Sequence, residues 1–299
     1  MRLPHISVCI CTYKRPRLLE RLLENLAAQE TGGLFTYSIV VADNDAAESG
    51  KAAAVAFQQS GAVPLEYCVE PRQNIALTRN KALENAHGDF AAFIDDDEFP
   101  AVNWLVSLLS ACEKYGVEGA VGPVKRHFDE APPHWILKGN FYDRAAYTTG
   151  LMIDWSQGRT NNTLVRRRIL PAEGAAFRPE FRSGEDQDFF RRMIAAGHRF
   201  VWSNEAVVYE VVPPVRWKRS FMMRRALLQG AASVLHPTFG TRDIVRSLVA
   251  VPAYAILLPF ALLGGHDRFM GLSIKLCDHL GKLLAVMKIN PIREPYVTE

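Results

Sequence analysis

Short apolar runs alternate with helix-like segments along the first 115 residues, and this alternation limits the fold more than any other feature of the sequence. The runs lack polar alternation, as expected of strands in a parallel sheet that is covered on both faces. Leucines at helical spacing follow the first run from Pro16, and proline is a good first residue for a helix. The pattern predicts an α/β fold, with an open, mostly parallel sheet and helices on both faces. The runs are residues 6–11, 37–43, 65–69 and 90–94.

Apolar residues recur at helical spacing further along the chain. Helices are expected from about Thr78 to Gly88, over 103–115 and over 186–196, whereas 125–182 is irregular. In open α/β sheets, ligands bind at the carboxyl ends of the strands, so polar groups that follow the strands should meet at one edge. These groups are Thr12 to Arg15, Asp43 to Asp45 and Asp95 to Glu98.

The charge is balanced, because 35 Lys and Arg face 32 Asp and Glu in 299 residues. This balance argues against a surface committed to nucleic acid. The five cysteines are widely spread and lack zinc-site spacing, which favours a reducing cytoplasm, and Cys9 and Cys11 are expected to be buried apolar residues. The apolar run near the N-terminus is too short for a secretory signal. We therefore expect the catalytic part of the chain in the cytosol.

Four consecutive acids, Asp95 to Glu98, follow the strand expected at 90–94. Their mutual repulsion is relieved if a divalent cation neutralises them. Oxygen ligands suit Mg²⁺ or Mn²⁺ on the phosphates of a nucleoside diphosphate better than zinc. The alternative is a helix N-cap with a solvated loop.

A second acidic run, Ser183 to Asp188, precedes the helix expected at 186–196. One of its carboxylates could take the proton from a sugar hydroxyl. Alternatively, the helix dipole stabilises acids in a first turn without any catalytic role. The spacing does not choose among these acids.

Two groups of basic residues are candidates for phosphate contacts. Arg72 and Arg79 lie with Asn74 and Asn80 near the start of a helix, where backbone donors also favour anions, although a solvated helix face is the alternative. The stretch 214–230 contains basic residues and no acid. It is a pyrophosphate clamp, a contact to anionic lipid headgroups, or merely a basic face. Its basic residues are Arg216, Lys218, Arg219, Arg224 and Arg225.

The C-terminal region differs in composition from the rest. Residues 247–265 carry no charge and approach the roughly 20 residues that span a bilayer, but Pro252 and Pro259 should break or kink a helix there. The sequence is therefore as consistent with a re-entrant hairpin, or with a pair of helices at the membrane interface, as with a helix that spans the bilayer. Residues 270–288 have the composition of a helix lying on an anionic membrane surface. The alternative is a helical hairpin packed on the protein core.

Several motifs together resemble glycosyltransferase family 2, a group of inverting enzymes with the GT-A fold. The resemblance covers about residues 5–212 and is especially marked to bacterial exopolysaccharide glucosyltransferases of the succinoglycan type. It implies a catalytic domain, expected over 1–230, and the composition of the remaining residues predicts a membrane-associating helical region over 231–299. The motifs are SVCICTYKRP, VVADND, NIALTRNKAL, FIDDDE and GEDQDFFRRMIAAG.

The resemblance assigns roles to individual residues. Asp43 would accept a hydrogen bond from uracil, Arg79 would approach the base or phosphates, and Asp96 would touch the donor sugar. Asp95 and Asp97 form the DxD pair, with Asp97 on the metal. The residues that would line the nucleotide pocket are Thr12, Tyr13 and Arg15.

The same resemblance makes Asp186 the catalytic base and Glu185 its neighbour at the acceptor. Many relatives place a metal-binding histidine after the late strand, whereas this chain has Glu210 there, which could replace it. No QxxRW motif is present, which argues against a processive synthase. No Walker A loop and no GxGxxG motif is present either, which disfavours P-loop and dinucleotide enzymes.

The implied activity is transfer of a sugar, glucose by resemblance, from a UDP-sugar to a saccharide hydroxyl with Mn²⁺ or Mg²⁺. The expected acceptor is linked to polyprenyl diphosphate, which Arg216, Arg224 and Arg225 would contact at the cytoplasmic face of the inner membrane. One alternative is a polyprenyl-phosphate sugar transferase of the same fold. Another is a saccharide-binding relative without activity.

Overall fold

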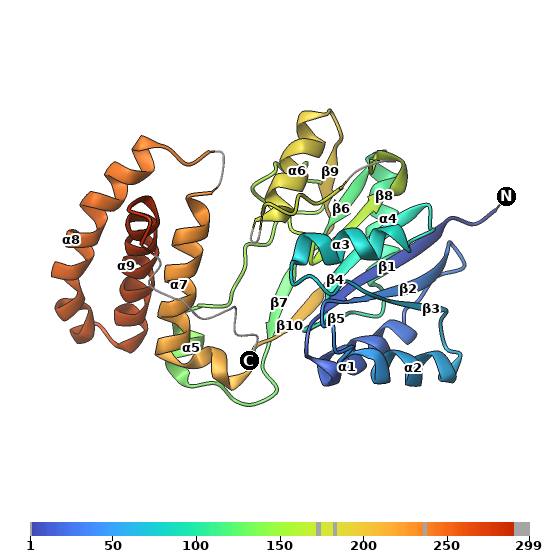
Figure 1. The fold of residues 1–299 in the computed structure, drawn as a ribbon, viewed down its shortest axis with the longest axis horizontal. Helices are drawn as coiled ribbons and strands as arrows, with labels where there is room; N and C mark the ends of the chain where they lie inside the picture. Colours follow the sequence, from blue (N-terminus) through green and yellow to red (C-terminus); the bar gives the residue numbers. More distant parts are fainter. Residues whose placement is uncertain (1, 172–174, 182–183, 236–237, 290–299) are drawn as a thin grey trace. The chain divides into compact units, whose positions relative to one another are not determined.

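The computed structural model describes residues 2–171, 175–181, 184–235 and 238–289. The chain forms two compact units, one of residues 1–126 and 144–211 and the other of residues 127–143 and 212–299 (Figure 1). This division differs from the single boundary expected at residue 230. Residues 127–143 and 212–230 belong with the C-terminal helices instead, because aromatic residues from both segments pack together, as Phe128 and Tyr142 do with one another and Phe128 does with Trp217.

The first unit is built on a seven-stranded sheet in the order β3-β2-β1-β4-β8-β6-β9. Its first four strands are parallel, as predicted, and β6 and β9 are also parallel. Among the described strands of this sheet, only β8 runs antiparallel to its neighbours, and it lies between β4 and β6. The strands are β1 (His5–Thr12), β2 (Thr36–Asp43), β3 (Leu65–Val69), β4 (Phe90–Asp95), β6 (Gly119–Val121), β8 (Asn162–Arg166) and β9 (Phe200–Trp202).

Helices cover both faces of this sheet. Ile6, Val8 and Ile10 of β1 point to one face and join a core cluster with α1, α2 and α4, whereas Cys9 points to the other face and packs with α3 and α6. Figure 1 shows α1 and α2 on the side of the sheet opposite α3. The helices are α1 (Pro16–Ala27), α2 (Lys51–Ser60), α3 (Ile75–Glu84), α4 (Trp104–Tyr115) and α6 (Glu185–Ala195).

The strand register brings the polar strand ends to one edge of the sheet. Thr12 pairs with Asp43 across β1 and β2, and Cys11 pairs with Asp95 across β1 and β4. The predicted convergence is therefore confirmed. A second sheet, in the order β5-β10-β7, continues from this edge because β5 (Glu98–Pro100) begins three residues after β4 ends. Its other strands are β10 (Val208–Val211) and β7 (Val124–His127).

The second unit is helical. It contains α5 (His134–Lys138), α7 (Arg219–Ser233), α8 (Thr241–Leu263) and α9 (His266–Val286), and α9 packs along both α7 and α8. Glycines set the contact between α7 and α9, because a β-carbon at Gly230 would clash with the carbonyl oxygen of Asp278, and one at Gly281 with that of Leu227. Small residues let helix backbones approach closely in this way.

The sequence predicts that Pro252 and Pro259 break or kink the apolar segment, and α8 excludes the break. The helix continues through both prolines, and Figure 1 shows it as one uninterrupted, curved ribbon. A proline removes one backbone hydrogen bond and bends a helix, which this helix accommodates without ending. It is long and apolar enough to cross a membrane, with a mean hydropathy of 1.8 over an 18-residue window that is only 6% buried.

Candidate active site

The four consecutive acids lie where β4 turns into β5. Asp95 ends β4, Glu98 begins β5, and Asp96 and Asp97 form the turn between them. Asp96, Asp97 and Glu98 are all buried, and Asp95 keeps 39% of its side chain exposed. Four acids in so little water need positive partners, which come from other parts of the chain.

The first partners come from the end of β1 and the start of α1. The Thr12 hydroxyl donates to Asp96 Oδ2 at 2.8 Å, and Arg15 Nη1 donates to Asp96 Oδ1 at 3.1 Å. The same Arg15 nitrogen lies 3.3 Å from Asp97 Oδ2. The turn between these two elements includes Lys14, whose φ of 56° is unusual for a residue with a side chain. Thr12 and Arg15, both predicted to bind the donor, are thus in direct contact with Asp96, which is predicted to do the same.

Arg79 joins the two acidic runs. It is buried on α3, with Nη2 at 3.4 Å from Asp95 Oδ1 and Nη1 paired with the carboxylate of Glu185, the first residue of α6. The N-cap of α3 is Asn74, whose side chain accepts from two backbone amides, and this fixes the start of the helix that carries Arg79. Burial acts to lower the pKa of Arg79, but Glu185, Asp95 and Asp186 raise it above its usual value. The guanidinium therefore stays charged between the two runs.

The structure separates the acids that sequence spacing left equivalent. Asp188 is buried, and its carboxylate pairs with Arg191 and Arg192 of its own helix, at 3.3 and 2.8 Å, so it stabilises α6. Asp186 is only partly buried, and its Oδ1 accepts from the backbone amide of Gln187 at 2.7 Å. Of the two, Asp186 is the one that remains partly accessible from outside the protein. Ser183 lies outside the described residues.

Crowding raises the pKa of several of these carboxyl groups. Burial, together with Asp97 and Glu210, raises the pKa of Asp95 to about 6, although Arg79 and Arg144 oppose the shift. Burial also raises the pKa of Asp96 to about 7, against the opposing charge of Arg15. Both carboxyl groups are therefore harder to ionise than in water, because burial outweighs the effect of the neighbouring arginines.

Glu210 lies beside this cluster, on β10 and directly opposite Glu98 of β5. It pairs with Arg144, and Asn161 Nδ2 donates to Glu98 Oε1 at 2.6 Å. Burial and the neighbouring Asp95 and Glu210 raise the pKa of Glu98 well above its usual value. The sequence reading missed Arg144 and Asn161, which lie in the stretch that showed no regular pattern. The many arginines of that stretch were the one available indication.

The oxygen atoms at this edge are of the type that binds a hard divalent cation. Asp95, Asp97 and Glu210 offer carboxylate oxygens that repel one another, and Asn161 Oδ1 is a buried oxygen with no hydrogen-bond partner in the part of the chain that the structure describes. However, no group of three or more acids, histidines or cysteines among the described residues is arranged to hold a metal ion. The residues fit a metal by type, and their arrangement would have to adjust to bind it.

Asp43 and Tyr13 lie at the same edge with different surroundings. Asp43 is fully buried, and its oxygens accept from the amides of Asp45 and Gly50 at 2.9 and 2.7 Å and from the Tyr67 hydroxyl at 2.9 Å. A contact with uracil stays a prediction, and it would have to share these oxygens. Tyr13 is partly exposed, with the Lys14 ammonium 5.1 Å from the centre of its ring.

The basic residues proposed to contact phosphate or lipid lie in the second unit. Arg216 is in a short 3-10 helix, where its carbonyl oxygen accepts from the Tyr142 hydroxyl at 2.6 Å. Arg224 and Arg225 are on α7 and are partly exposed. Their contact with a pyrophosphate or a lipid headgroup stays a prediction.

Comparison with known proteins identifies the fold and the family. Residues 7–177 match the family described as Glycosyl transferase family 2. The succinoglycan biosynthesis protein ExoM of Rhizobium meliloti is 34% identical over 233 residues, which are 76% of this chain and 73% of ExoM. The similarity to ExoM therefore covers most of the chain and is not confined to the short motifs.

Solved structures agree on the fold. The mannosyltransferase PcManGT from Pyrobaculum calidifontis, in complex with GDP-Man and Mn²⁺, has a TM-score of 0.66 at 15% identity, over 97% of this chain and 89% of its own. Residues 1–349 of S. aureus TarS, in complex with UDP, have a TM-score of 0.54 at 15% identity, over 98% and 93%. A longer TarS chain is matched over 42% of its length. With the GT-A fold confirmed, the matched residues and the similarity to ExoM show that this chain belongs to glycosyl transferase family 2.

Proposed function

We propose that the protein transfers glucose from UDP-glucose to a hydroxyl of a saccharide acceptor, with inversion, in the synthesis of an exopolysaccharide or other surface glycan. The observation that carries this proposal is Arg79, which joins the strand-end acids to the start of α6. This contact brings together a site for a charged donor and a carboxylate for the acceptor. The similarity to ExoM supports the exopolysaccharide context.

The donor occupies the edge of the sheet beside Thr12, Tyr13 and Arg15. The choice of uridine rests on the resemblance and on TarS, whose structure contains UDP, whereas PcManGT contains GDP-Man. Arg15 already lies between two carboxylates, and a diphosphate is a further anion that its guanidinium suits. A divalent cation such as Mn²⁺ or Mg²⁺, held by Asp95, Asp97 and Glu210, would supply Lewis-acid stabilisation of the leaving diphosphate.

Asp186 acts as the general base. It takes the proton of the acceptor hydroxyl while that oxygen forms a bond to the anomeric carbon, and the bond from this carbon to the diphosphate oxygen breaks on the opposite face. Glu185 holds Arg79 in place beside it, so that the two acids are divided between positioning and proton transfer. Positioned base catalysis typically contributes about 10² to 10⁴ in rate.

The acceptor is linked to polyprenyl diphosphate at the cytoplasmic face of the membrane. This part of the proposal rests on α8, whose apolar side chains are exposed, and on the basic residues Arg216, Arg224 and Arg225. Exposed apolar surface on this scale is typical of a membrane or protein contact.

The test compares two variants that should fail differently. Asp186→Asn should lower kcat on a saccharide acceptor by about 10² or more, with UDP binding in the presence of Mn²⁺ unchanged. Asp97→Ala should lose the Mn²⁺-dependent part of UDP binding, measured by calorimetry. Glu20→Gln, an exposed acid on α1, is the control for both.

Other results for these two variants would change the proposal in specific ways. A mild effect of Asp186→Asn on turnover would favour a phosphate acceptor, which needs no base, and hence a polyprenyl-phosphate sugar transferase. Equal loss of UDP affinity would place Asp186 in donor binding. Unchanged Mn²⁺-dependent affinity in Asp97→Ala would remove the metal from the proposal.

A further inference from the structure

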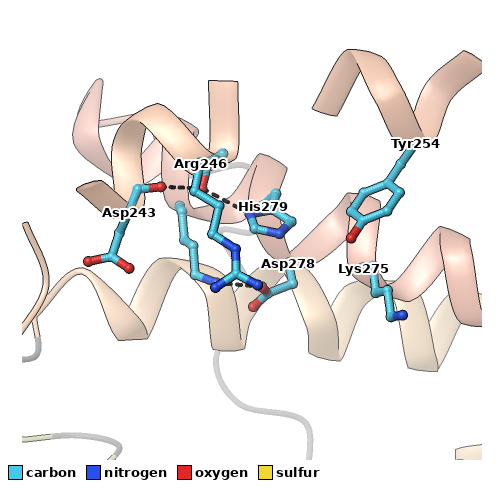
Figure 2. A pocket seen from close by; sticks show the side chains of 8 residues that line it. Asp243, Arg246, Tyr254, Lys275, Asp278 and His279 are labelled. Atoms are coloured by element: carbon cyan, nitrogen blue, oxygen red, sulfur yellow. Dashed lines mark hydrogen bonds and ion pairs between the residues drawn. The ribbon is translucent and has the colours of Figure 1, made fainter. Parts of the chain in front are cut away.

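A charged pocket of about 310 Å³ lies between α8 and α9, within the second unit (Figure 2). The first turns of α8 contribute Asp243, Arg246 and Ser247 to it, and the second half of α9 contributes Asp278, His279 and Lys282. Ligand pockets range from about 300 to 1,000 Å³, so this one has room for a compact group rather than an oligosaccharide.

The pocket has an excess of positive charge. Of its two acids, Asp278 pairs with Lys282 at 2.5 Å, and Asp243 accepts from the amide of Gly240 at 3.0 Å, which caps α8. In the part of the chain that the structure describes, Arg246 and Lys275 form no ion pair, and both are exposed at the mouth of the pocket. Figure 2 shows Arg246 reaching from α8 toward His279 and Asp278. Two cations are thus available to an anion.

The floor of the pocket is a fixed hydrogen-bonded pair. Ser247 is fully buried, and its hydroxyl donates to the carbonyl oxygen of Asp243 at 2.8 Å. Since that hydroxyl has only one hydrogen, His279 Nδ1, 2.9 Å away, must be the donor in their contact. In its neutral form, the His279 ring then presents Nε2 as an acceptor, which can receive a hydrogen bond from a hydroxyl group.

The surroundings distinguish a lipid headgroup from a free anion. Beyond the pocket, α8 exposes large apolar side chains, including Leu248, Val249 and Ile256. If α8 contacts the bilayer as proposed above, the pocket lies at the polar end of its apolar surface, where headgroups are found. An acyl chain can then follow the apolar side of α8 while its headgroup enters the pocket.

We propose that this pocket binds the headgroup of an anionic phospholipid. Arg246 and Lys275 contact the phosphate, and His279 accepts a hydrogen bond from a headgroup hydroxyl. The inference rests on the proposed membrane contact of α8, but it does not depend on the sugar transferred or on the acceptor.

The test uses the full chain in neutral detergent micelles, with phosphatidylglycerol or phosphatidylcholine added at increasing ratio. Native mass spectrometry then measures the fraction of protein that carries one lipid. At low lipid ratios the micelle surface stays nearly neutral, so general attraction of basic residues to a charged surface contributes little there. No donor sugar is present, so failure here is distinct from failure of the transfer reaction.

We expect the wild-type chain to prefer phosphatidylglycerol and to saturate at one lipid. R246Q/K275Q should lose this affinity at least tenfold, while R242Q/K288Q, which removes the same charge from exposed positions outside the pocket, should retain it. Both substituted pairs are exposed, and unchanged circular dichroism and melting temperature verify folding.

Three results would overturn the proposal. Equal loss in both variants would assign the binding to general surface charge. No preference for phosphatidylglycerol would remove the headgroup from the pocket. Displacement of the lipid by inorganic phosphate at similar concentration would make the pocket a site for a free anion.

Discussion

The two units place charge and apolar surface in opposite ways. The first unit covers its apolar side chains on both faces of a sheet and buries charged groups such as Asp96, Glu98 and Arg79 at one edge. The second unit leaves the apolar side of α8 uncovered. Buried charge lowers stability unless it is paired, and exposed apolar surface is unfavourable in water. Neither unit is therefore arranged for maximal stability, as expected if the first binds a nucleotide-sugar and the second a lipid, as proposed above.

The largest loss of stability is expected from Arg79→Met, which tests the buried charges of the first unit. It leaves Glu185 buried without its partner, and removal of one member of a buried ion pair typically costs about 3 to 5 kcal/mol. Urea denaturation should show this loss. Arg17→Met, an exposed arginine on α1, should change the free energy of unfolding little, and R79M/E185M should recover much of the loss. A single variant as stable as the wild type would mean that the pair contributes nothing to folding.

A smaller effect should appear in the helical unit with Gly281→Ala. The added methyl group meets the backbone of α7, and overpacking of this kind costs about 1 to 3 kcal/mol. Gly271→Ala is the matched control on the same helix, because nothing lies within 4 Å of its added methyl group. Alanine is the better helix former by about 1 kcal/mol, so this control should raise stability. Melting curves that move in the same direction for both variants would contradict the close contact of α7 and α9.

The third effect is a pH dependence centred on Asp96. Its pKa is raised to about 7 in the folded chain, so the folded state holds a proton that the unfolded state has already released. This stabilisation is complete below the ordinary carboxyl range and is lost as pH rises toward about 7. Relative to Asp96→Asn, the wild type should therefore lose stability between about pH 4 and pH 7.

Urea unfolding at several pH values measures this difference. Glu20→Gln provides the comparison for an exposed acid. A wild type that gains stability over the variant as pH rises would show that the charged form of Asp96 is the favoured one.

The sequence predicted those helices and strands whose residues all favour the same secondary structure. The strands ending at Thr12, Asp43 and Asp95 are continuous apolar runs, and their parallel arrangement followed from the helices between them. The helix at Lys51–Ser60 was not placed because its alanines give it little apolar periodicity. For the helix at Thr241–Leu263, the sequence left both a break and a kink open, because a proline lowers helix stability but does not indicate whether tertiary or membrane contacts compensate.

The sequence predicted which acidic residues belong to the site, but not which residues they pair with. The two acidic runs stood out as residues, yet only the fold shows that Arg79 holds them together and that Asp188 is occupied by arginines of its own helix. Arg144 could not be found from sequence, because its partner Glu210 lies 66 residues away in an unrelated strand. The catalytic and binding roles themselves remain predictions.

The contact between Arg79 and Glu185 has a practical consequence for anyone who trims the chain. The family match ends at residue 177, which is before the start of α6. A fragment cut at that limit would retain the nucleotide end of the site and discard Glu185 and Asp186. Its failure to transfer sugar would then report the position of the cut, not the chemistry of the enzyme.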